Sequence, residues 1–210
     1  HGSADAIARK FLNDGDSVLE IGAADGEFTH VYAARVGMSG HVVAVEPDRV
    51  QYEALQRQFE RKPWVTVKPC AVGAAPGAAV FYPDRTSPKR SSLYAENVMD
   101  PGDSYLVLTT TIDALVASMP RAPKLIQVDA QGSEPAILRG ATKALSLAIV
   151  WVIEVWHYGL INAGADVSDV ITPFRAYAYT PRSILGKRLE WHEAYDYAAR
   201  RIIHRALYLP

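Results

Sequence analysis

The residues best suited to bind a ligand follow a short apolar run near the start of the chain. Ser17–Ile21 is typical of a β-strand and leads directly into the small residues Gly22-Ala23-Ala24-Asp25-Gly26. Glycine has no Cβ, so Gly22 and Gly26 let the backbone approach a ligand closely. Their G-x-x-x-G spacing differs from the G-x-G-x-x-G of dinucleotide sites and favours a smaller nucleoside-containing ligand. Glu46 ends the next predicted strand, where a carboxylate is suited to hold the two hydroxyls of a ribose.

A second group of candidates surrounds Asp129. This aspartate follows the apolar run Leu125–Val128, at the carboxyl end of a predicted strand, where open α/β sheets bind their ligands. Gly132 permits close approach, and Glu134 begins a predicted helix. The helix dipole stabilises a carboxylate at that position, so Glu134 either contacts a ligand or stabilises the helix start. Asp129 is the stronger candidate, because a buried aspartate without a partner is costly.

These residues need a scaffold, and the chain supplies one by alternating short apolar runs with amphipathic stretches. The other predicted strands are His41–Val45, Val65–Val67, Ala148–Val155, Ala176–Thr180 and His204–Leu209. The predicted helices are Glu27–Val36, a segment from an N-cap at Asp48 to about Arg61, and Glu134–Leu138. Alternating strands and helices are typical of parallel βαβ units and predict a doubly wound α/β sheet. The carboxyl ends of its strands share one crevice, which brings the Gly22 turn and Asp129 together.

Residues 73–108 interrupt this alternation with several Gly, Pro and Ser residues. We expect a hairpin or extended strands followed by a long loop. Long loops in compact domains are often lids or binding loops, so we predict that residues 82–105 cover the site.

Composition narrows the class of protein. A length of 210 residues predicts one domain, and His1-Gly2-Ser3 resembles the remnant of a purification tag, which leaves residues 4–210. Lys plus Arg total 22 and Asp plus Glu total 23, so nothing indicates a nucleic-acid partner. Leu145–Trp156, the longest apolar stretch, is shorter than the ~20 residues of a membrane span. The single cysteine, Cys70, excludes an internal disulfide and favours the cytoplasm.

The glycine turn followed by Glu46 resembles the cofactor site of class I S-adenosylmethionine-dependent methyltransferases. Within that class, Leu125–Ala141 resembles the K-I-D-x-E-G-x-E-x-x-x-L-x-G-A signature of the FkbM family. Thr109–Leu115 and Ile153–His157 resemble its neighbouring segments. Gln127 and Gln131 depart from the family pattern, because they replace its usual Lys and Glu. The resemblance implies a Rossmann-like, seven-stranded, mostly parallel sheet with helices on both faces and an antiparallel last strand.

The resemblance also implies roles for individual residues. The cofactor would be S-adenosyl-L-methionine and the reaction O-methyl transfer to a sugar, glycan or specialised metabolite. Substrate contacts are expected from Ser91, Ser92, Glu134 and Trp156. Catalytic roles are expected for Asp129, His157 and Glu154. Cofactor contacts are expected from Glu20, Gly22, Ala23, Asp25, Gly26, Phe28, Thr29, Glu46, Pro47, Cys70, Ala71 and Asp129.

The chemistry leaves several alternatives open. A hydroxyl acceptor must lose its proton, and His157 is the better base near neutral pH, with Asp129 orienting the hydroxyl. His157 is equally well read as a hydrogen-bonded residue at a strand end, and Glu154 as a group that orients a substrate or His157. No spacing demands a metal, so we expect none. Two rival functions are a catalytically silent binding module and a nicotinamide-dependent oxidoreductase, the second disfavoured by the missing G-x-G-x-x-G. The acceptor and the oligomeric state are not predicted.

Overall fold

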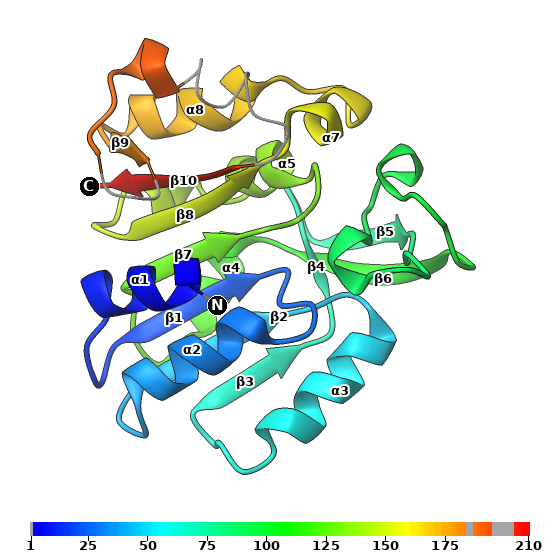
Figure 1. The fold of residues 1–210 in the computed structure, drawn as a ribbon, viewed down its shortest axis with the longest axis horizontal. Helices are drawn as coiled ribbons and strands as arrows, with labels where there is room; N and C mark the ends of the chain where they lie inside the picture. Colours follow the sequence, from blue (N-terminus) through cyan, green and yellow to red (C-terminus); the bar gives the residue numbers. More distant parts are fainter. Residues whose placement is uncertain (1, 184–186, 195–203) are drawn as a thin grey trace.

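The computed structural model describes residues 2–183, 187–194 and 204–210. Its central element is a seven-stranded sheet, whose arrangement Figure 1 shows. The strand order is β3-β2-β1-β7-β8-β10-β9. Neighbours from β3 to β8 run parallel, whereas β10 is antiparallel to both β8 and β9. The predicted Rossmann-like sheet with an antiparallel last strand is therefore confirmed. The strands are β1 (Ser17–Ile21), β2 (His41–Val45), β3 (Val65–Lys68), β7 (Leu125–Val128), β8 (Val150–Val155), β9 (Thr180–Ser183) and β10 (His204–Leu209).

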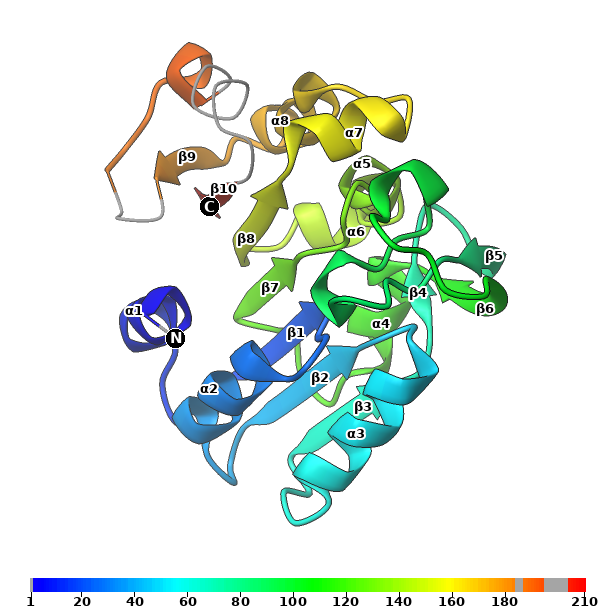
Figure 2. The same ribbon diagram turned by 45° about the vertical axis from the view of Figure 1, so that its right-hand side comes forward.

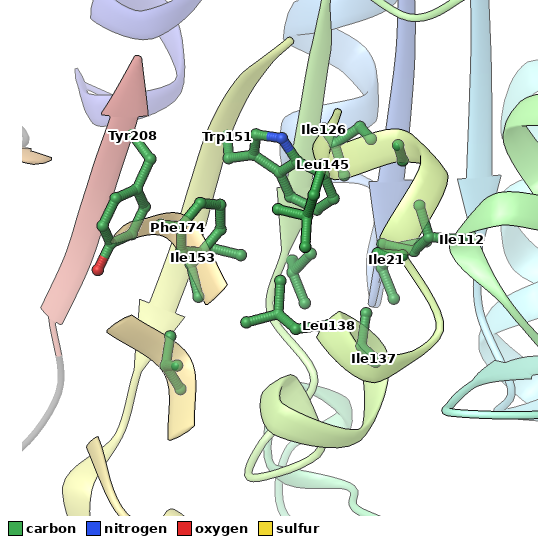
Figure 3. Close-up of a cluster of buried hydrophobic side chains, with 14 of the residues drawn as sticks. Ile21, Ile112, Ile126, Ile137, Leu138, Leu145, Trp151, Ile153, Phe174 and Tyr208 are labelled. Atoms are coloured by element: carbon green, nitrogen blue, oxygen red, sulfur yellow. The ribbon is translucent and has the colours of Figure 1, made fainter. Parts of the chain in front are cut away.

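Helices cover both faces of the sheet, so its central strands are apolar throughout. One face packs on α1 (Gly2–Phe11) and α2 (Glu27–Val36), through buried residues such as Val18 and Tyr32. The other face packs on α4 (Ile112–Ser118), α5 (Glu134–Arg139), α6 (Thr142–Leu145) and α8 (Val167–Ala176). Figure 3 shows this second core, in which Ile21 and Trp151 meet side chains from the helices. All residues of β1, β7 and β8 are buried, as expected for strands covered on both faces.

Local sequence signals explain the ends of the first helices. Gly26 precedes α2 in a left-handed conformation, with a φ of 81°. Asp48 caps α3 (Arg49–Phe59), because its carboxylate accepts hydrogen bonds from the Val50 and Gln51 backbone N–H groups. The cap predicted at Asp48 is confirmed, although the helix ends at Phe59 rather than near Arg61.

A small second sheet lies beyond the carboxyl ends of the central strands (Figures 1 and 2). It contains β4 (Ala71–Val72), β5 (Gly77–Phe81) and β6 (Tyr105–Thr110), in the order β4-β6-β5. The sequence predicts a hairpin or extended strands in residues 73–108, followed by a long loop. The extended strands are present, but the long loop lies between the two antiparallel strands β5 and β6 and does not follow them. Residues 82–104 form this loop, and the pairing of Phe81 with Tyr105 joins its two ends. We call residues 82–104 the cover loop; it contains the short 3-10 helices η1 (Pro88–Arg90) and η2 (Ala95–Asn97).

The predicted strand Ala176–Thr180 is wrong. Helix α8 extends to Ala176, because its buried residues Val167, Val170, Ile171 and Phe174 follow a helical spacing and a capping box at Asp166 starts it. Ala178 then turns the chain with a φ of 60°, and the strand begins at Thr180. The short helix α7 (His157–Asn162) follows β8 after one residue, Trp156. No helix in the described ranges is long and apolar enough to cross a membrane.

Candidate cofactor and acceptor site

A cavity of about 370 Å³ opens at the carboxyl ends of β1, β2 and β7. Its wall is formed by the β1 turn, the end of β2, the loop after β7 and the cover loop. The cavity therefore lies at the crevice expected for a ligand in an open α/β sheet. The predicted site residues that line it are Glu20, Gly22, Ala23, Asp25, Phe28, Glu46, Pro47, Cys70, Ala71, Ser91, Ser92 and Asp129.

The β1 turn is held by protein contacts at both of its glycines. Gly22 and Gly26 have φ values of 81°, in the left-handed region that disfavours other residues. A Cβ at Gly22 would lie 1.9 Å from the backbone oxygen of Asp129, and one at Gly26 would lie 2.7 Å from Leu55 Cδ2. Both glycines are thus required by packing within the protein, whether or not a ligand approaches them. Gly22 lines the cavity, whereas Gly26 does not.

Glu46 directly follows β2 and lines the cavity. Its Oε2 accepts a hydrogen bond from the Ala24 backbone N–H at 2.7 Å, and its Oε1 accepts one from the Asp48 backbone N–H at 2.8 Å. Burial raises the pKa of Glu46 to about 7, against the lowering effect of these two hydrogen bonds. Each carboxylate oxygen has a further lone pair, so Glu46 can accept two more hydroxyl donors from the cavity.

Glu20 is the most deeply buried acid of the cavity wall, at 1% exposure. Burial raises its pKa to about 8, opposed by a hydrogen bond from Thr29 and reinforced by the charges of Asp129, Glu46 and Asp25. The Thr29 hydroxyl donates to Glu20 Oε2 at 2.6 Å, so Thr29, which does not line the cavity, supports a residue that does. These clustered acids favour a ligand that brings positive charge.

Gln127 and Gln131, the two departures from the family pattern, both line the cavity. Gln127 is the ladder partner of Glu20 across β1 and β7, and its Oε1 accepts a hydrogen bond from the Tyr32 hydroxyl. Its neutral side chain adds no positive charge beside Glu20. Gln131 follows Asp129 in the loop after β7, and its Nε2 donates to Asp129 Oδ1 and to Glu154 Oε2. Glu154 is therefore joined to the site through Gln131, although it does not itself line the cavity.

Glu134, the first residue of α5, binds the backbone of the loop after β7. Its two carboxylate oxygens accept hydrogen bonds from the Ala130 and Gly132 backbone N–H groups, both at 2.9 Å. Burial raises its pKa to about 7, while these backbone hydrogen bonds act in the opposite direction. Glu134 is 1% exposed and does not line the cavity. Its contacts are those of an anchor for the loop backbone, and the predicted substrate contact stays a prediction.

His157 and Trp156 lie at the start of α7, outside the cavity lining. The His157 Nδ1 is buried and has no hydrogen-bond partner among the described residues. The Trp156 ring packs against Gly159, where a Cβ would lie 2.3 Å from Trp156 Cε3. The structure thus brings Asp129 into the cavity wall and leaves His157 beyond it.

The end of β5 and the cover loop supply further cavity residues. Phe81 of β5, and Pro88, Lys89 and Leu93 of the cover loop, join the predicted Ser91 and Ser92 in the lining. They reach the site through the pairing of distant strands, which no local pattern reveals. The basic groups Arg85, Lys89 and Arg90 were alternatives for contact with an anionic substrate, and of these Lys89 lines the cavity. The Ser92 hydroxyl donates to the Gln131 backbone oxygen at 2.8 Å, and the Ser91 hydroxyl accepts from the Asp84 backbone N–H at 3.0 Å.

Two features hold the cover loop in place. Inside it, the buried Asp84 carboxylate accepts hydrogen bonds from the Thr86, Ser87, Met99 and Asp100 backbone N–H groups. Burial works against the ionised form, but a hydrogen bond from the Thr86 hydroxyl, together with these backbone hydrogen bonds, prevails and lowers the pKa of Asp84 to about 2.

At the mouth of the cavity, Lys89 Nζ lies 3.1 Å from Asp25 Oδ2 and 2.7 Å from Glu27 Oε2. This ion pair joins the cover loop to the β1 turn and the start of α2. We call it the Lys89 latch. Across the described ranges, no group of three or more His, Cys, Asp or Glu side chains is arranged to hold a metal ion.

Three solved structures that share this architecture are distant from this chain in sequence. A putative rRNA methylase from Clostridium thermocellum has a TM-score of 0.58 at 10% identity, covering 99% of this chain and 93% of that one. Fibrillarin from Aeropyrum pernix, solved with S-adenosyl-L-methionine, has a TM-score of 0.56 at 10% identity, with coverage of 99% and 73%. The O-methyltransferase TomG from Streptomyces achromogenes has a TM-score of 0.51 at 14% identity, with coverage of 98% and 77%. These likenesses establish the fold.

The strand order, the cavity and these neighbours together define the Rossmann-like fold of class I S-adenosylmethionine-dependent methyltransferases. The family described as the methyltransferase FkbM domain matches residues 20–181. This chain therefore belongs to the FkbM family of methyltransferases. The comparison with curated proteins found no match.

Proposed function

We propose that this protein binds S-adenosyl-L-methionine in the cavity and transfers its methyl group to a hydroxyl of a sugar or specialised metabolite. The observation that carries the proposal is the acidic wall formed by Glu20, Glu46 and Asp129 at the ends of three adjacent strands. A cationic cofactor with a ribose suits this wall, because Glu46 retains lone pairs for hydroxyl donors and Glu20 favours a positive neighbour. When bound, this cofactor supplies an electrophilic methyl group on a positively charged sulfur.

The chain's own residues would then position the acceptor. Asp129 lies in the cavity wall, so we propose that its carboxylate accepts the hydrogen bond of the acceptor hydroxyl and orients its oxygen. The cover loop, held by the Lys89 latch, would exclude water from the same space. A role for His157 as the proton acceptor stays a prediction, because His157 stands outside the cavity lining.

The charges at the mouth support an acceptor without negative charge. Lys89 is paired with Asp25 and Glu27, and Arg85 lies 3.6 Å from Asp100. A phosphorylated acceptor or a nucleic-acid backbone at the mouth would therefore meet Asp25 and Glu27 beside Lys89, whereas the exposed Arg90, whose Nη1 lies 3.6 Å from Met99 Sδ, stands outside the cavity lining. An uncharged hydroxylated molecule avoids this repulsion.

The test is methyl transfer from radiolabelled S-adenosylmethionine to a panel of phenols, glycosides and hydroxylated natural products, each with a phosphorylated counterpart where one exists. We expect transfer to at least one uncharged acceptor, and loss of about 10²-fold or more in rate for Asp129→Asn. Transfer to phosphorylated acceptors alone would contradict the proposed acceptor class. Cofactor binding with no transfer above the enzyme-free rate would favour the silent binding module.

A further inference from the structure

The loop after β7 carries a side-chain bridge that the proposed reaction does not by itself explain. Gln131 Nε2 donates one hydrogen bond to Asp129 Oδ1 at 2.9 Å and another to Glu154 Oε2 at 2.6 Å. A carboxamide nitrogen has two hydrogens, so both are directed at carboxylates. The bridge joins the ends of two neighbouring strands, β7 and β8, without adding charge between two acids that would otherwise repel each other.

The backbone of Gln131 is fixed from the opposite side. Its φ is 49°, a left-handed conformation that a residue with a Cβ keeps only when its surroundings enforce it. The Gln131 carbonyl oxygen accepts hydrogen bonds from the Ser92 hydroxyl at 2.8 Å and from Asn97 Nδ2 at 2.9 Å. Asn97 is 3% exposed and also donates to the Gly159 carbonyl oxygen at 3.0 Å. The cover loop therefore holds Gln131 in one conformation.

Asp129 has a fixed backbone as well. Its N–H donates to the Ile21 carbonyl oxygen at 3.0 Å, and its own carbonyl oxygen packs against Gly22. The orientation of the Asp129 side chain depends on its own contacts, and one of these is the direct hydrogen bond from Gln131 to its carboxylate. A chain of contacts thus runs from the cover loop through Gln131 to the acid in the cavity wall.

We propose that Gln131 is a positioning residue that acts through Asp129, holding its carboxylate toward the positively charged end of a ligand in the cavity. The inference rests on the proposed binding of S-adenosylmethionine. If Gln131 acts in this way, breaking the bridge removes one of the contacts that orient the carboxylate and weakens its attraction for positive charge. A residue that merely shapes the loop would instead affect charged and uncharged ligands alike.

S-adenosylmethionine and S-adenosylhomocysteine separate these two roles, because only the first carries a positive charge on sulfur. The readout is the ratio of their affinities, measured by calorimetry. Gln131→Asn keeps a residue that tolerates the left-handed conformation but shortens the amide, so it should break the bridge while preserving the loop. Gln131→Met keeps the length and removes the donors. Gln56→Met, on the exposed surface of α3, is the matched control.

We expect both Gln131 variants to lower the affinity ratio by about threefold or more, and Gln56→Met to leave it unchanged. In an Asp129→Asn background, the same Gln131 variants should have no further effect on the ratio, since they act through the missing carboxylate. Equal losses for both ligands, or a shift that persists in Asp129→Asn, would overturn the inference. If the wild-type protein bound neither ligand, the proposed function would fail first, so the two failures are distinguishable.

Discussion

Replacing Glu20 by Gln should make the ligand-free protein more stable at alkaline pH. Burial raises the pKa of Glu20 to about 8, from an ordinary value of 4.5. The unfolded chain therefore releases the Glu20 proton at lower pH than the folded chain does. Between these two pKa values each rise of one pH unit favours the unfolded state by about 1.4 kcal/mol. Protonated Glu20 therefore contributes fully to the stability of the folded protein below its pKa in the unfolded chain. That contribution is lost as the pH rises through its pKa in the folded protein.

Glutamine keeps the shape of Glu20 and cannot ionise, and its amide oxygen can still accept the Thr29 hydroxyl bond. The free energy of unfolding of Glu20→Gln should exceed that of the wild type by about 3–5 kcal/mol above pH 8, and by less than about 1 kcal/mol near pH 5. Urea denaturation at both pH values, without cofactor, measures the difference. Glu53→Gln is the matched control, because Glu53 lies on the exposed face of α3, 3.8 Å from Arg57.

Parallel pH profiles for the wild type and Glu20→Gln would refute this reasoning. They would mean that Glu20 ionises in the folded protein as easily as in water, through solvent or counter-charge in the cavity. A gain of stability that was equal at both pH values would also contradict it, because relief of ionisation cannot act where the side chain is already protonated.

Three further changes test other parts of the site. Glu46→Ala should weaken S-adenosylhomocysteine binding by about 1–3 kcal/mol in calorimetry, the cost of a lost charged hydrogen-bond partner, and unchanged affinity would rule out the ribose contact. Gly22→Ala should lower the free energy of unfolding by more than about 2 kcal/mol, because its Cβ would meet backbone. Gly73→Ala, with open space around it, should stay within about 1 kcal/mol, and equal effects would show that packing does not select Gly22. Lys89→Met should speed S-adenosylhomocysteine dissociation about two- to fivefold in stopped-flow measurements, as expected for the loss of an exposed ion pair. Arg90→Met is the control and should leave the dissociation rate unchanged. Equal dissociation rates for the two variants would show that the Lys89 latch does not retain the ligand.

The parts of the fold set by local patterns were predictable. Ser17–Ile21 has the predicted limits because its apolar run ends at Gly22. His204–Leu209 also has the predicted limits and is followed by Pro210. Asp48 was predictable as a helix cap because its type and position suffice. Ala176–Thr180 was not, because the residues around Tyr177 suit a strand as well as a helix end. Only the packing of α8 decides between them.

The candidate site divides in the same way. Glu20, Glu46 and Asp129 share one cavity because the carboxyl ends of neighbouring parallel strands converge, a rule that needs only the strand order. Phe81 enters the cavity from the end of β5 and Lys89 from the cover loop, and the course of both depends on strand pairing over a long separation in sequence. No local pattern contains that information.

Sequence reasoning also attached a ligand role to residues whose observed contacts are with the protein itself, and that ligand role stays a prediction. The two glycines of the β1 turn meet protein atoms at the distances that exclude a Cβ. The carboxylate of Glu134 is bonded to the backbone of Ala130 and Gly132. Residue type and spacing revealed that these positions are constrained, but only the contacts reveal which partner imposes the constraint.

We propose above that the acidic cavity binds S-adenosylmethionine. A calorimetric titration of the wild-type protein with S-adenosylhomocysteine, and in parallel with NAD, measures this binding. We expect saturable binding of one S-adenosylhomocysteine per chain and no binding of NAD. Saturable binding of NAD, or no binding of S-adenosylhomocysteine by protein shown to be folded, would contradict it.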